Sequence, residues 1–340
     1  MGIAGGEMGM IDFNNSEITY AIEAVREAAL LADKVQRDLV SEALTKEDRS
    51  PVTVADFAAQ AVVAKRLADI FPDAILVGEE DSKALREEAE SARLAQVAHF
   101  VQTIFDSASQ EDVCDWIDLG GQRPSKRFWT LDPVDGTKGF LRKEQYAVAL
   151  ALIEDGQVQI AALGCPHISK GRKVEIGGEG SLVLAVRDQG SWTQALNKPE
   201  GKWTALQVSA QEDRTRGRLL RSAEAAHTDL SALDKIIQHL GIGTEALRMD
   251  SQAKYSLLAA GEGELLFRLI SPKSPDYKEK IWDQAAGSLV VEEAGGRISD
   301  LDGLELDFRQ GRRLENNRGV LATNGLLHEE ALAAIRAEKA

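Results

Sequence analysis

The segment from Trp129 to Thr137 reads WTLDPVDGT, an apolar run that ends in two aspartates three positions apart. The run predicts a strand, and Pro133 restricts the turn in which the strand ends. Two carboxylates as close as Asp132 and Asp135 repel each other unless a cation intervenes, and hard ions such as Mg²⁺ prefer carboxylate, carbonyl and water oxygens. The segment therefore predicts a divalent-metal site at a strand end.

Gly136 and Thr137 extend this site towards a phosphate group. Gly136 lets a ligand approach the backbone, and Thr137 can cap a following helix whose N-terminal amides favour a phosphate. A DPxD segment alone is about as often a polar turn as a metal site. The attached Gly-Thr pair favours the metal site.

Three further acids lie in segments that would complete such a site. Glu79 ends a predicted strand in VGEE, residues 77–80, and Asp283 lies in the first turn of a predicted helix in KIWDQAAG, residues 280–287. Asp56 lies near another helix start. Each acid alone is more simply a solvated or helix-capping side chain. Their co-occurrence with the aspartate pair favours one shared site.

The first third of the chain alternates helical and strand-like patterns. Apolar residues recur at helical spacing across 16–39, with Ser16 as a plausible N-cap, and again across 53–70. The apolar run at 74–77 predicts a strand. Residues 81–111 are rich in Glu, Ala, Arg and Gln, which predicts exposed helix.

Antiparallel sheet is predicted next, followed by alternating helices and strands. Asp155-Gly156 between two apolar runs is a strong hairpin signal. The predicted strands lie at 128–131, 146–153, 158–163, 265–270 and 319–323, and the later helices at 230–240, 253–260, 283–294 and 328–337. This order predicts an α/β fold with layered α and β elements, in two halves, 1–165 and 166–340, joined near Cys165-Pro166.

The composition is that of an ordinary globular protein, with 44% hydrophobic and 28% charged residues among 340. A formal charge of −15 repels nucleic acid and anionic membranes, so a phosphate ligand must be met by local cations or bound metal. Cys114 and Cys165 are too few for a zinc site or a disulfide framework, and we expect structural roles for them. Without a leader pattern or eighteen consecutive apolar residues, we expect a cytoplasmic protein, and we expect it to be a monomer.

Five segments in order resemble the lithium-sensitive, Mg²⁺-dependent phosphatase superfamily that includes the inositol monophosphatases, and within it the 3′(2′),5′-bisphosphate nucleotidases. The resemblance covers roughly residues 17–330, and the segments read KEDRSPVTVADFAAQ, FPDAILVGEED, LDPVDGTKGFLRKEQYAVALALI, RMDSQAKYSLLA and EKIWDQAAGSLVVEEAGG. The resemblance implies a sugar-phosphatase-like fold, with an antiparallel N-terminal sheet half and a mixed α/β C-terminal half.

The resemblance also implies a metal site and a reaction. Asp56 and Thr137 would orient and deprotonate a metal-activated water, and no covalent nucleophile is needed. Two or three Mg²⁺ ions would be held by Glu79, Asp132, the Val134 carbonyl, Asp135 and Asp283.

Substrate contacts follow from the same resemblance. Arg268 would hold a 5′-phosphate away from the metals, and its simpler alternative is a surface ion pair. A GHSSH-like stretch of the nucleotidases reads AEAAH at 223–227 here, which keeps only its final His. The implied substrate-binding residues are Gly136, Thr137, His227, Ser251, Lys254, Arg268 and Asp283.

The function implied is Mg²⁺-dependent hydrolysis of the 3′-phosphate of 3′-phosphoadenosine 5′-phosphate to AMP and phosphate. Its sulfated analogue, 3′-phosphoadenylyl sulfate, is a further candidate substrate. An inositol phosphate phosphatase is the enzymatic alternative, and it would share the metal site. A non-catalytic nucleotide sensor is an alternative of another class, but a sensor would not need Asp56 and Thr137.

Overall fold

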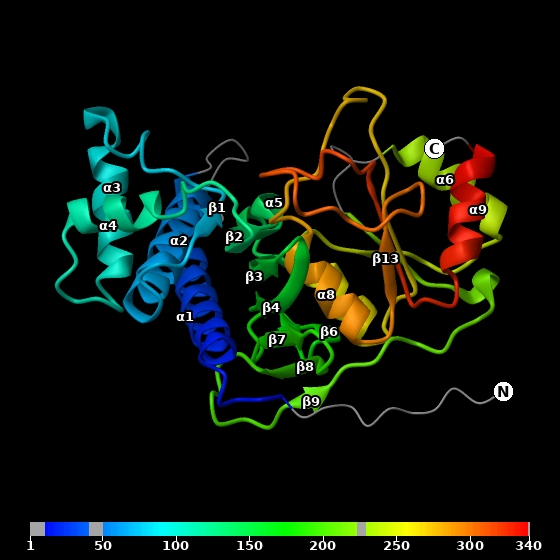
Figure 1. Ribbon diagram of the computed structural model, residues 1–340, viewed down its shortest axis with the longest axis horizontal. Helices are drawn as coiled ribbons and strands as arrows, with labels where there is room; N and C mark the ends of the chain where they lie inside the picture. The colour runs from blue at the N-terminus through cyan, green and yellow to red at the C-terminus, as the bar shows by residue number, and fades with distance from the viewer. Residues whose placement is uncertain (1–10, 41–49, 223–228, 339–340) are drawn as a thin grey trace.

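The protein is layered, with pairs of helices alternating with two sheets. A computed structural model describes residues 11–40, 50–222 and 229–338. Its helices are α1 (Ser16–Leu39), α2 (Ser50–Ile70), α3 (Ser91–Val101), α4 (Gln110–Asp118), α5 (Thr137–Leu141), α6 (Leu230–Leu240), α7 (Ala253–Ala259), α8 (Ala285–Glu293) and α9 (His328–Glu338), with short 3₁₀ turns at Glu88–Glu90 and Arg214–Arg216. In Figure 1 the layers run from the blue helices α1 and α2, through the green strands and α8, to α6 and α9 at the opposite end.

The first sheet has seven strands in the order β1-β2-β3-β4-β7-β8-β9. They are β1 (Leu76–Gly78), β2 (Arg127–Asp135), β3 (Ala147–Glu154), β4 (Gln157–Cys165), β7 (Ser181–Val186), β8 (Gly190–Ala195) and β9 (Thr204–Ala205); a separate hairpin joins β5 (Ile168–Ser169) and β6 (Lys173–Val174). β1 is parallel to β2, and the other neighbouring pairs are antiparallel. Asp155 and Gly156, both with positive φ, turn the predicted hairpin between β3 and β4.

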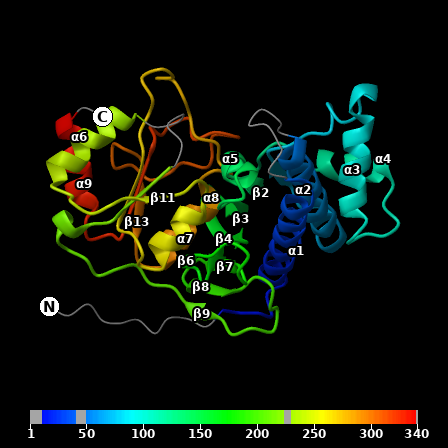
Figure 2. The same cartoon turned by 180° about the vertical axis from the view of Figure 1, so that it is seen from behind.

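Alternate residues of the first sheet face two different helix layers. Trp129 packs towards α1 and α2, where Tyr20 meets its ring edge-on with the centroids 5.0 Å apart. Phe128, one position away, packs instead into the layer of α7 and α8. Figure 2 shows these two helices side by side from behind. Because both faces are covered, the strands read as nearly continuous apolar runs.

The second sheet has five strands in the order β11-β10-β12-β14-β13, with both parallel and antiparallel pairs. Its strands are β10 (Leu219–Arg221), β11 (Leu247–Arg248), β12 (Leu265–Arg268), β13 (Arg297–Ser299) and β14 (Val320–Thr323). Leu220 and Leu266 face the layer of α7 and α8, whereas Leu219 and Leu265 face α6 and α9. The helices α7 and α8 are therefore buried between the two sheets.

The boundary between the sheets lies later than the predicted division near Cys165-Pro166. β7 follows Cys165 but pairs with β4, and β8 and β9 continue the same sheet to Ala205. Strands that follow each other along the chain usually lie side by side in a sheet. Here the short β5–β6 hairpin separates β4 from β7 in the sequence, so their pairing could not be predicted from it. The ranges 1–165 and 166–340 therefore do not follow the sheets.

Two helix starts differ from the prediction. Asn15, not Ser16, caps α1, because its side chain accepts hydrogen bonds from the backbone N–H groups of Glu17 at 2.8 Å and Ile18 at 3.3 Å. α8 begins at Ala285 after a residue with φ of −127°, so Asp283 precedes the helix and is not in its first turn.

Residues 81–111 contain less helix than predicted. Ser82 donates to the Asp118 carboxylate from its backbone N–H at 2.9 Å and from Oγ at 2.7 Å, and Arg86 binds Glu111 at 2.6 Å. Such side-chain bonds compete with helical backbone bonds and fix an irregular turn ahead of α3.

Both cysteines are free thiols, and both are buried, as expected of structural residues. In the described part of the chain, no helix has the length and apolar character needed to cross a membrane.

Candidate active site

Four acidic side chains from distant parts of the chain meet at one edge of the first sheet. Glu79 directly follows β1, and Asp132 and Asp135 lie near the end of β2. Because β1 and β2 are parallel neighbours, their carboxyl ends meet at the same edge. Asp283 reaches this edge from the turn that precedes α8, and α8 packs on β3 and β4.

A β-bulge in β2 sets the direction of the aspartate pair. Asp132 lies opposite Ala149 and Asp135 opposite Ala147, so three steps along β2 match two along β3. In a regular strand, residues three positions apart point to opposite faces, and the extra residue turns both carboxylates to one side. Pro133 lies within this bulge, where proline is tolerated in a sheet.

Burial raises the pKa of all four carboxyl groups, and neighbouring carboxylates add to the rise at Glu79, Asp132 and Asp283. Burial raises the pKa of Asp132 well above its usual range, and the charges of Glu79 and Asp135 add to the rise. Burial and then the Asp135 charge raise the pKa of Glu79, although its side chain reaches solvent at the rim of the cluster. The pKa of Asp283 is likewise raised well above its usual range, by burial first and by Asp135 and Glu79 among the neighbouring charges.

The surroundings of the Asp132 side chain indicate whether these residues fit a cation. It is 2% exposed, and its Oδ1 has no hydrogen-bond partner among the residues that the structure describes. A buried carboxylate oxygen without a partner is costly, and oxygen atoms of this kind are the ligands that Mg²⁺ takes. The residues therefore fit Mg²⁺. Within the described ranges, no three Asp, Glu, His or Cys side chains already converge as a metal-binding group, so the site is a set of neighbouring carboxylates and not a closed coordination shell.

Asp56 and Thr137 adjoin this carboxylate cluster. Asp56 lies in the second turn of α2, so it does not cap the helix. It is half-buried, and burial followed by the charges of Glu80 and Glu79 raises its pKa well above the usual range. Thr137 is the first residue of α5, which packs against α2, and the cap position belongs to Gly136.

Two other residues of the aspartate segment, Gly136 and Val134, are explained by their local structure. Gly136 has a φ of +99°, and a Cβ atom there would lie 2.8 Å from the Ser251 Cβ, so glycine is needed for the turn and for this close approach. The Val134 side chain is buried in the core beside α2. The role of its carbonyl as a ligand stays a prediction.

Lys254 and Ser251 bring positive charge and a polar turn to the cluster. Ser251 has a φ of +71°, and the Lys254 Nζ donates to its carbonyl at 2.8 Å. Burial lowers the pKa of Lys254 to about 8, while the Asp135 charge acts in the opposite direction. Lys254 therefore keeps most of its charge at neutral pH.

Arg268, the last residue of β12, lies beside the carboxylates. This differs from the expectation that it lies away from the metals. Its charge lowers the pKa of both Asp135 and Asp283, acting against the burial that raises them. Its Nη2 binds Glu279 Oε2 at 2.7 Å. Glu279 is 3% exposed, so this is not the surface ion pair considered as the alternative. Within the described part of the chain, the Arg268 Nε has no hydrogen-bond partner. His227, the remaining predicted contact, lies outside the described residues.

Sequence patterns give no role to two residues that hold the acidic segments. The backbone N–H of Gln252 donates to Asp135 Oδ2 at 2.6 Å. Arg312 donates to the Gly78 carbonyl at 2.5 Å and stacks over the Trp282 ring, with its Cζ 4.6 Å from the centroid. Gly78 and Trp282 immediately precede two of the acids. For Gln252, the one signal in the sequence is its place inside the DSQAKY motif.

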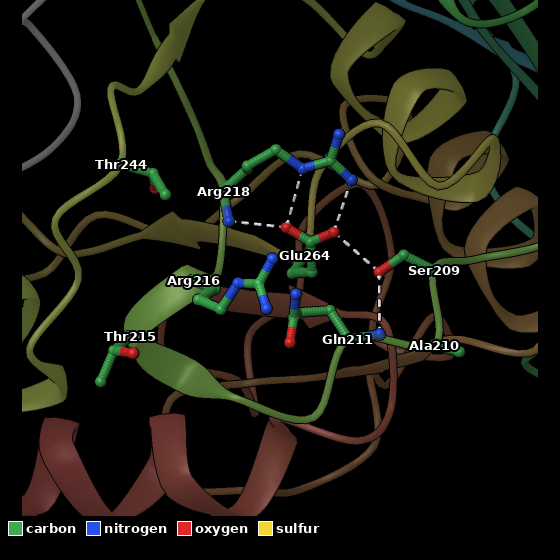
Figure 3. A pocket seen from close by; sticks show the side chains of 8 residues that line it. All are labelled: Ser209, Ala210, Gln211, Thr215, Arg216, Arg218, Thr244 and Glu264. Atoms are coloured by element: carbon green, nitrogen blue, oxygen red, sulfur yellow. Dashed lines mark hydrogen bonds and ion pairs between the residues drawn. The ribbon is translucent and has the colours of Figure 1, made fainter.

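A separate polar cavity of about 590 Å³ lies at the start of β10 and β12. Figure 3 shows Arg218 and Ser209 binding Glu264 there, and the Arg218 Nη2 to Glu264 Oε1 distance is 2.6 Å. Arg268 lies at the other end of β12, so this cavity is not the predicted site. The cavity is lined by Ser209, Ala210, Gln211, Thr215, Arg216, Arg218, Thr244 and Glu264.

Solved structures with the same architecture include an inositol monophosphatase from Zymomonas mobilis. It matches with a TM-score of 0.63 at 18% identity, covering 96% of this chain and 100% of the other. Mycobacterium tuberculosis SuhB matches with a TM-score of 0.61 at 17% identity, covering 94% and 95%. At these identities the likeness establishes the fold alone.

Sequence comparison identifies the family. A 3′(2′),5′-bisphosphate nucleotidase from Schizosaccharomyces pombe is 40% identical over 341 residues, covering 95% of this chain and 96% of that protein. A protein of the same name from Oryza sativa is 38% identical, covering 94% of each. The model of the inositol monophosphatase family matches residues 14–340. With this match over nearly its whole length, the chain belongs to the inositol monophosphatase family.

Proposed function

We propose that this chain is a Mg²⁺-dependent 3′(2′),5′-bisphosphate nucleotidase that converts 3′-phosphoadenosine 5′-phosphate to AMP and phosphate. The observation that carries the proposal is the gathering of Glu79, Asp132, Asp135 and Asp283 at one sheet edge, where the buried Asp132 Oδ1 has no partner among the described residues. The names and identities of the curated relatives support the nucleotide substrate.

The carboxylate cluster would hold two or three Mg²⁺ ions together with the Val134 carbonyl. Bound there, Mg²⁺ would neutralise phosphoryl oxygens, lower the pKa of water and stabilise the leaving oxygen. The carboxylates would fix the position of the scissile phosphate at the open rim, where Glu79 reaches solvent.

Asp56 and Thr137 would act on the attacking water. A carboxylate whose pKa is raised is a better proton acceptor near neutral pH, and burial and two glutamates raise the pKa of Asp56 in this way. The Thr137 hydroxyl would orient the water. Asp56 would accept the hydroxyl proton while the hydroxyl takes up the proton that the water loses. The packing of α5 on α2 supports this pairing.

Lys254 and Arg268 would bind the substrate next to Gly136 and Ser251. An acidic protein needs such local cations to hold a second phosphate, and Arg can meet a phosphate with two parallel hydrogen bonds. Since Arg268 already binds Glu279, the 5′-phosphate would compete with or extend this pair. The same contacts would accept 3′-phosphoadenylyl sulfate. We propose that the enzyme acts in the cytoplasm as a monomer.

The test is phosphate release from four substrates, each with and without Mg²⁺: 3′-phosphoadenosine 5′-phosphate, 3′-phosphoadenylyl sulfate, adenosine 3′-monophosphate and inositol 1-phosphate. We expect the bisphosphate to be hydrolysed with the highest kcat/KM, and only with Mg²⁺. Faster hydrolysis of inositol 1-phosphate would replace the nucleotidase with an inositol phosphatase. Nucleotide binding without any phosphate release would leave a sensor.

A further inference from the structure

Gln252 connects the acidic segment at the end of β2 with the turn that carries Asp283. Its backbone N–H donates to Asp135 Oδ2 at 2.6 Å. Its side-chain Nε2 donates to the Trp282 carbonyl at 2.9 Å, and its Oε1 accepts from the Gly287 N–H at 3.0 Å. One residue thus binds a proposed ligand at the end of β2 and grips both sides of the turn that carries Asp283.

The local backbone explains why Gln252 can do this. Ser251 adopts a left-handed φ of +71°, which turns the chain sharply just before α7. Gln252 occupies the N-cap position of α7, where backbone N–H groups have no partner inside the helix. Its N–H is therefore available to the Asp135 carboxylate.

The side chain of Gln252 is bound on both of its polar atoms in a closed environment. It is 1% exposed, so solvent does not replace the two bonds. Tyr255, one turn further along α7, packs so tightly on Gly287 that a Cβ there would lie 2.1 Å from its ring. The start of α7 is thus fitted closely to the turn and the start of α8.

We propose that Gln252 is a positioning residue that fixes Asp135 relative to Asp283, and so sets the affinity of the site for Mg²⁺. This inference rests on the proposed metal-dependent function. Groups that hold metal ligands in place typically change metal affinity 10- to 100-fold when they are lost. Gln252 would act through Asp135 and the turn before α8, because its hydrogen bonds go to these two places.

The test is direct Mg²⁺ binding by calorimetry to the full chain and to Gln252→Met. Methionine keeps the length and the backbone N–H but removes both side-chain bonds to the turn. We expect the Mg²⁺ dissociation constant to rise about 10- to 100-fold. We also expect the KM for the nucleotide at saturating Mg²⁺ to change little, because the cations that bind the substrate remain.

Gln194→Met is the matched control. Gln194 is also a buried glutamine that donates to a backbone carbonyl, that of Pro199 at 3.1 Å, but it lies on β8. Its replacement should cost stability without changing Mg²⁺ affinity. Equal Mg²⁺ affinities for Gln252→Met and the unmodified protein would overturn the inference, as would equal losses in both variants.

Gln252→Glu covers the case in which the methionine variant does not fold. Glutamate still accepts from the Gly287 N–H but loses the donor to the Trp282 carbonyl, so we expect a smaller effect, a Mg²⁺ affinity about tenfold weaker. Unchanged affinity in this variant would also overturn the inference. Failure of the unmodified protein to bind Mg²⁺ at all would remove the proposed function as well, and this outcome is distinct from equal binding by protein and variant.

Discussion

Asp135 is subject to opposing influences at a single carboxyl group. Burial raises its pKa, whereas the charges of Lys254 and Arg268 and the hydrogen bond from Gln252 act to lower it. The net direction is upward, so the protein alone does not compensate fully for burying the charge. A bound divalent cation would supply the remaining stabilisation.

Asp135→Asn should abolish turnover while leaving the fold intact. Asparagine has nearly the same shape and can still accept from Gln252, but it removes one negative charge from the proposed metal site. We expect kcat to fall at least about 100-fold with little change in Tm. The control is Asp155→Asn, in the hairpin turn, where asparagine suits the positive φ. Near-normal turnover of Asp135→Asn at limiting Mg²⁺ would contradict the assignment.

Thr137→Ala tests water activation separately from metal retention. Loss of the hydroxyl should lower kcat by roughly 10- to 1,000-fold, the range expected for lost proton-transfer assistance, with Mg²⁺ affinity nearly unchanged. Rates at saturating Mg²⁺ and calorimetric Mg²⁺ titrations measure the two effects. Thr204→Ala, on the exposed edge strand β9, is the control. If the rate recovers fully at high Mg²⁺, Thr137 serves the metal and not the water.

Residues that act through their own side-chain chemistry could be predicted, and residues that act through backbone contacts could not. Asp132 and Asp135 lie in one short motif, where close carboxylates themselves indicate a cation. Arg312 binds a backbone carbonyl more than two hundred positions away. Nothing in its local sequence indicates that partner, because any residue type presents the same carbonyl.

At the scale of elements, Arg312 fastens the end of β1 to the turn before α8. It binds the Gly78 carbonyl and stacks on Trp282, and the Lys280 Nζ also lies 5.2 Å from the Trp282 ring centroid. Glu79 follows Gly78 in the sequence, and Asp283 follows Trp282. The spacing of two proposed ligands thus depends on a loop that contributes none itself.

Arg312→Met should loosen this connection between elements. We expect a loss of about 1–3 kcal/mol in the free energy of unfolding from the missing hydrogen bond and cation–π contact, with weaker Mg²⁺ binding. Denaturant unfolding and Mg²⁺ titration measure both. Arg309→Met, in the same loop, removes an ion pair between the exposed Arg309 and the half-buried Asp307 and should cost less than about 1 kcal/mol. Equal effects of the two substitutions would remove the role given to Arg312.

The docking of α9 on the second sheet should depend on pH through His328. This fully buried residue contacts Thr323 Oγ1 at 3.0 Å and Ser299 Oγ at 2.9 Å. Burial, with a smaller contribution from Arg297, lowers the pKa of His328 to about 4, and Glu329 opposes the shift. Between the unfolded value of about 6.5 and this value, only the unfolded chain binds the proton. Stability should therefore fall as the pH falls through that window.

The measurement compares the unmodified protein with His328→Asn in denaturant at about pH 7.5 and about pH 4.5. The stability difference between the two proteins should shrink at the lower pH by up to about 3 kcal/mol, because only the unmodified protein loses the His328 contribution. Comparison with the variant cancels the titration of the acidic site. His99→Asn, at an exposed position on α3, is the control variant. A pH-independent difference would exclude the role of His328.

For the whole molecule, the layer order could be predicted in part from the sequence. Continuous apolar runs and the Asp155-Gly156 turn predicted the antiparallel sheet, and helical periodicity predicted α1 and α2, all of which the structure confirms. The sheet boundary could not be placed, because β7 is joined to β4 by pairing across an intervening hairpin. Such pairing depends on the register of distant strands, which composition does not encode locally.

Because of the overall negative charge, only groups at the site itself can attract the substrate. A net charge of −15 repels a nucleotide bearing two phosphates, so attraction must come from cations at the site. Lys254 and Arg268 are the proposed cations, and both lie close enough to Asp135 to lower its pKa. We expect a second phosphate on the substrate to be recognised mainly by Arg268, because an arginine can meet a phosphate with two parallel hydrogen bonds.

Arg268→Ala should raise the KM for 3′-phosphoadenosine 5′-phosphate about tenfold or more, because a charge-assisted contact is lost. It should barely change the KM for adenosine 3′-monophosphate, which has no 5′-phosphate. Arg297→Ala, which removes an exposed ion pair with Glu329 from β13, is the control. Steady-state kinetics with both nucleotides at saturating Mg²⁺ measure the difference.

The Arg268→Ala variant leaves Glu279 buried without its ion-pair partner, so a second variant is needed to separate binding from stability. Arg268→Ala combined with Glu279→Gln removes both charges and should restore much of the lost stability, since an unpaired buried charge costs more than none. It should keep the raised KM for the bisphosphate, because the phosphate contact is still absent. A KM that returns to normal in the double variant would mean that Arg268 only neutralises Glu279. The 5′-phosphate would then have to be bound by other cations.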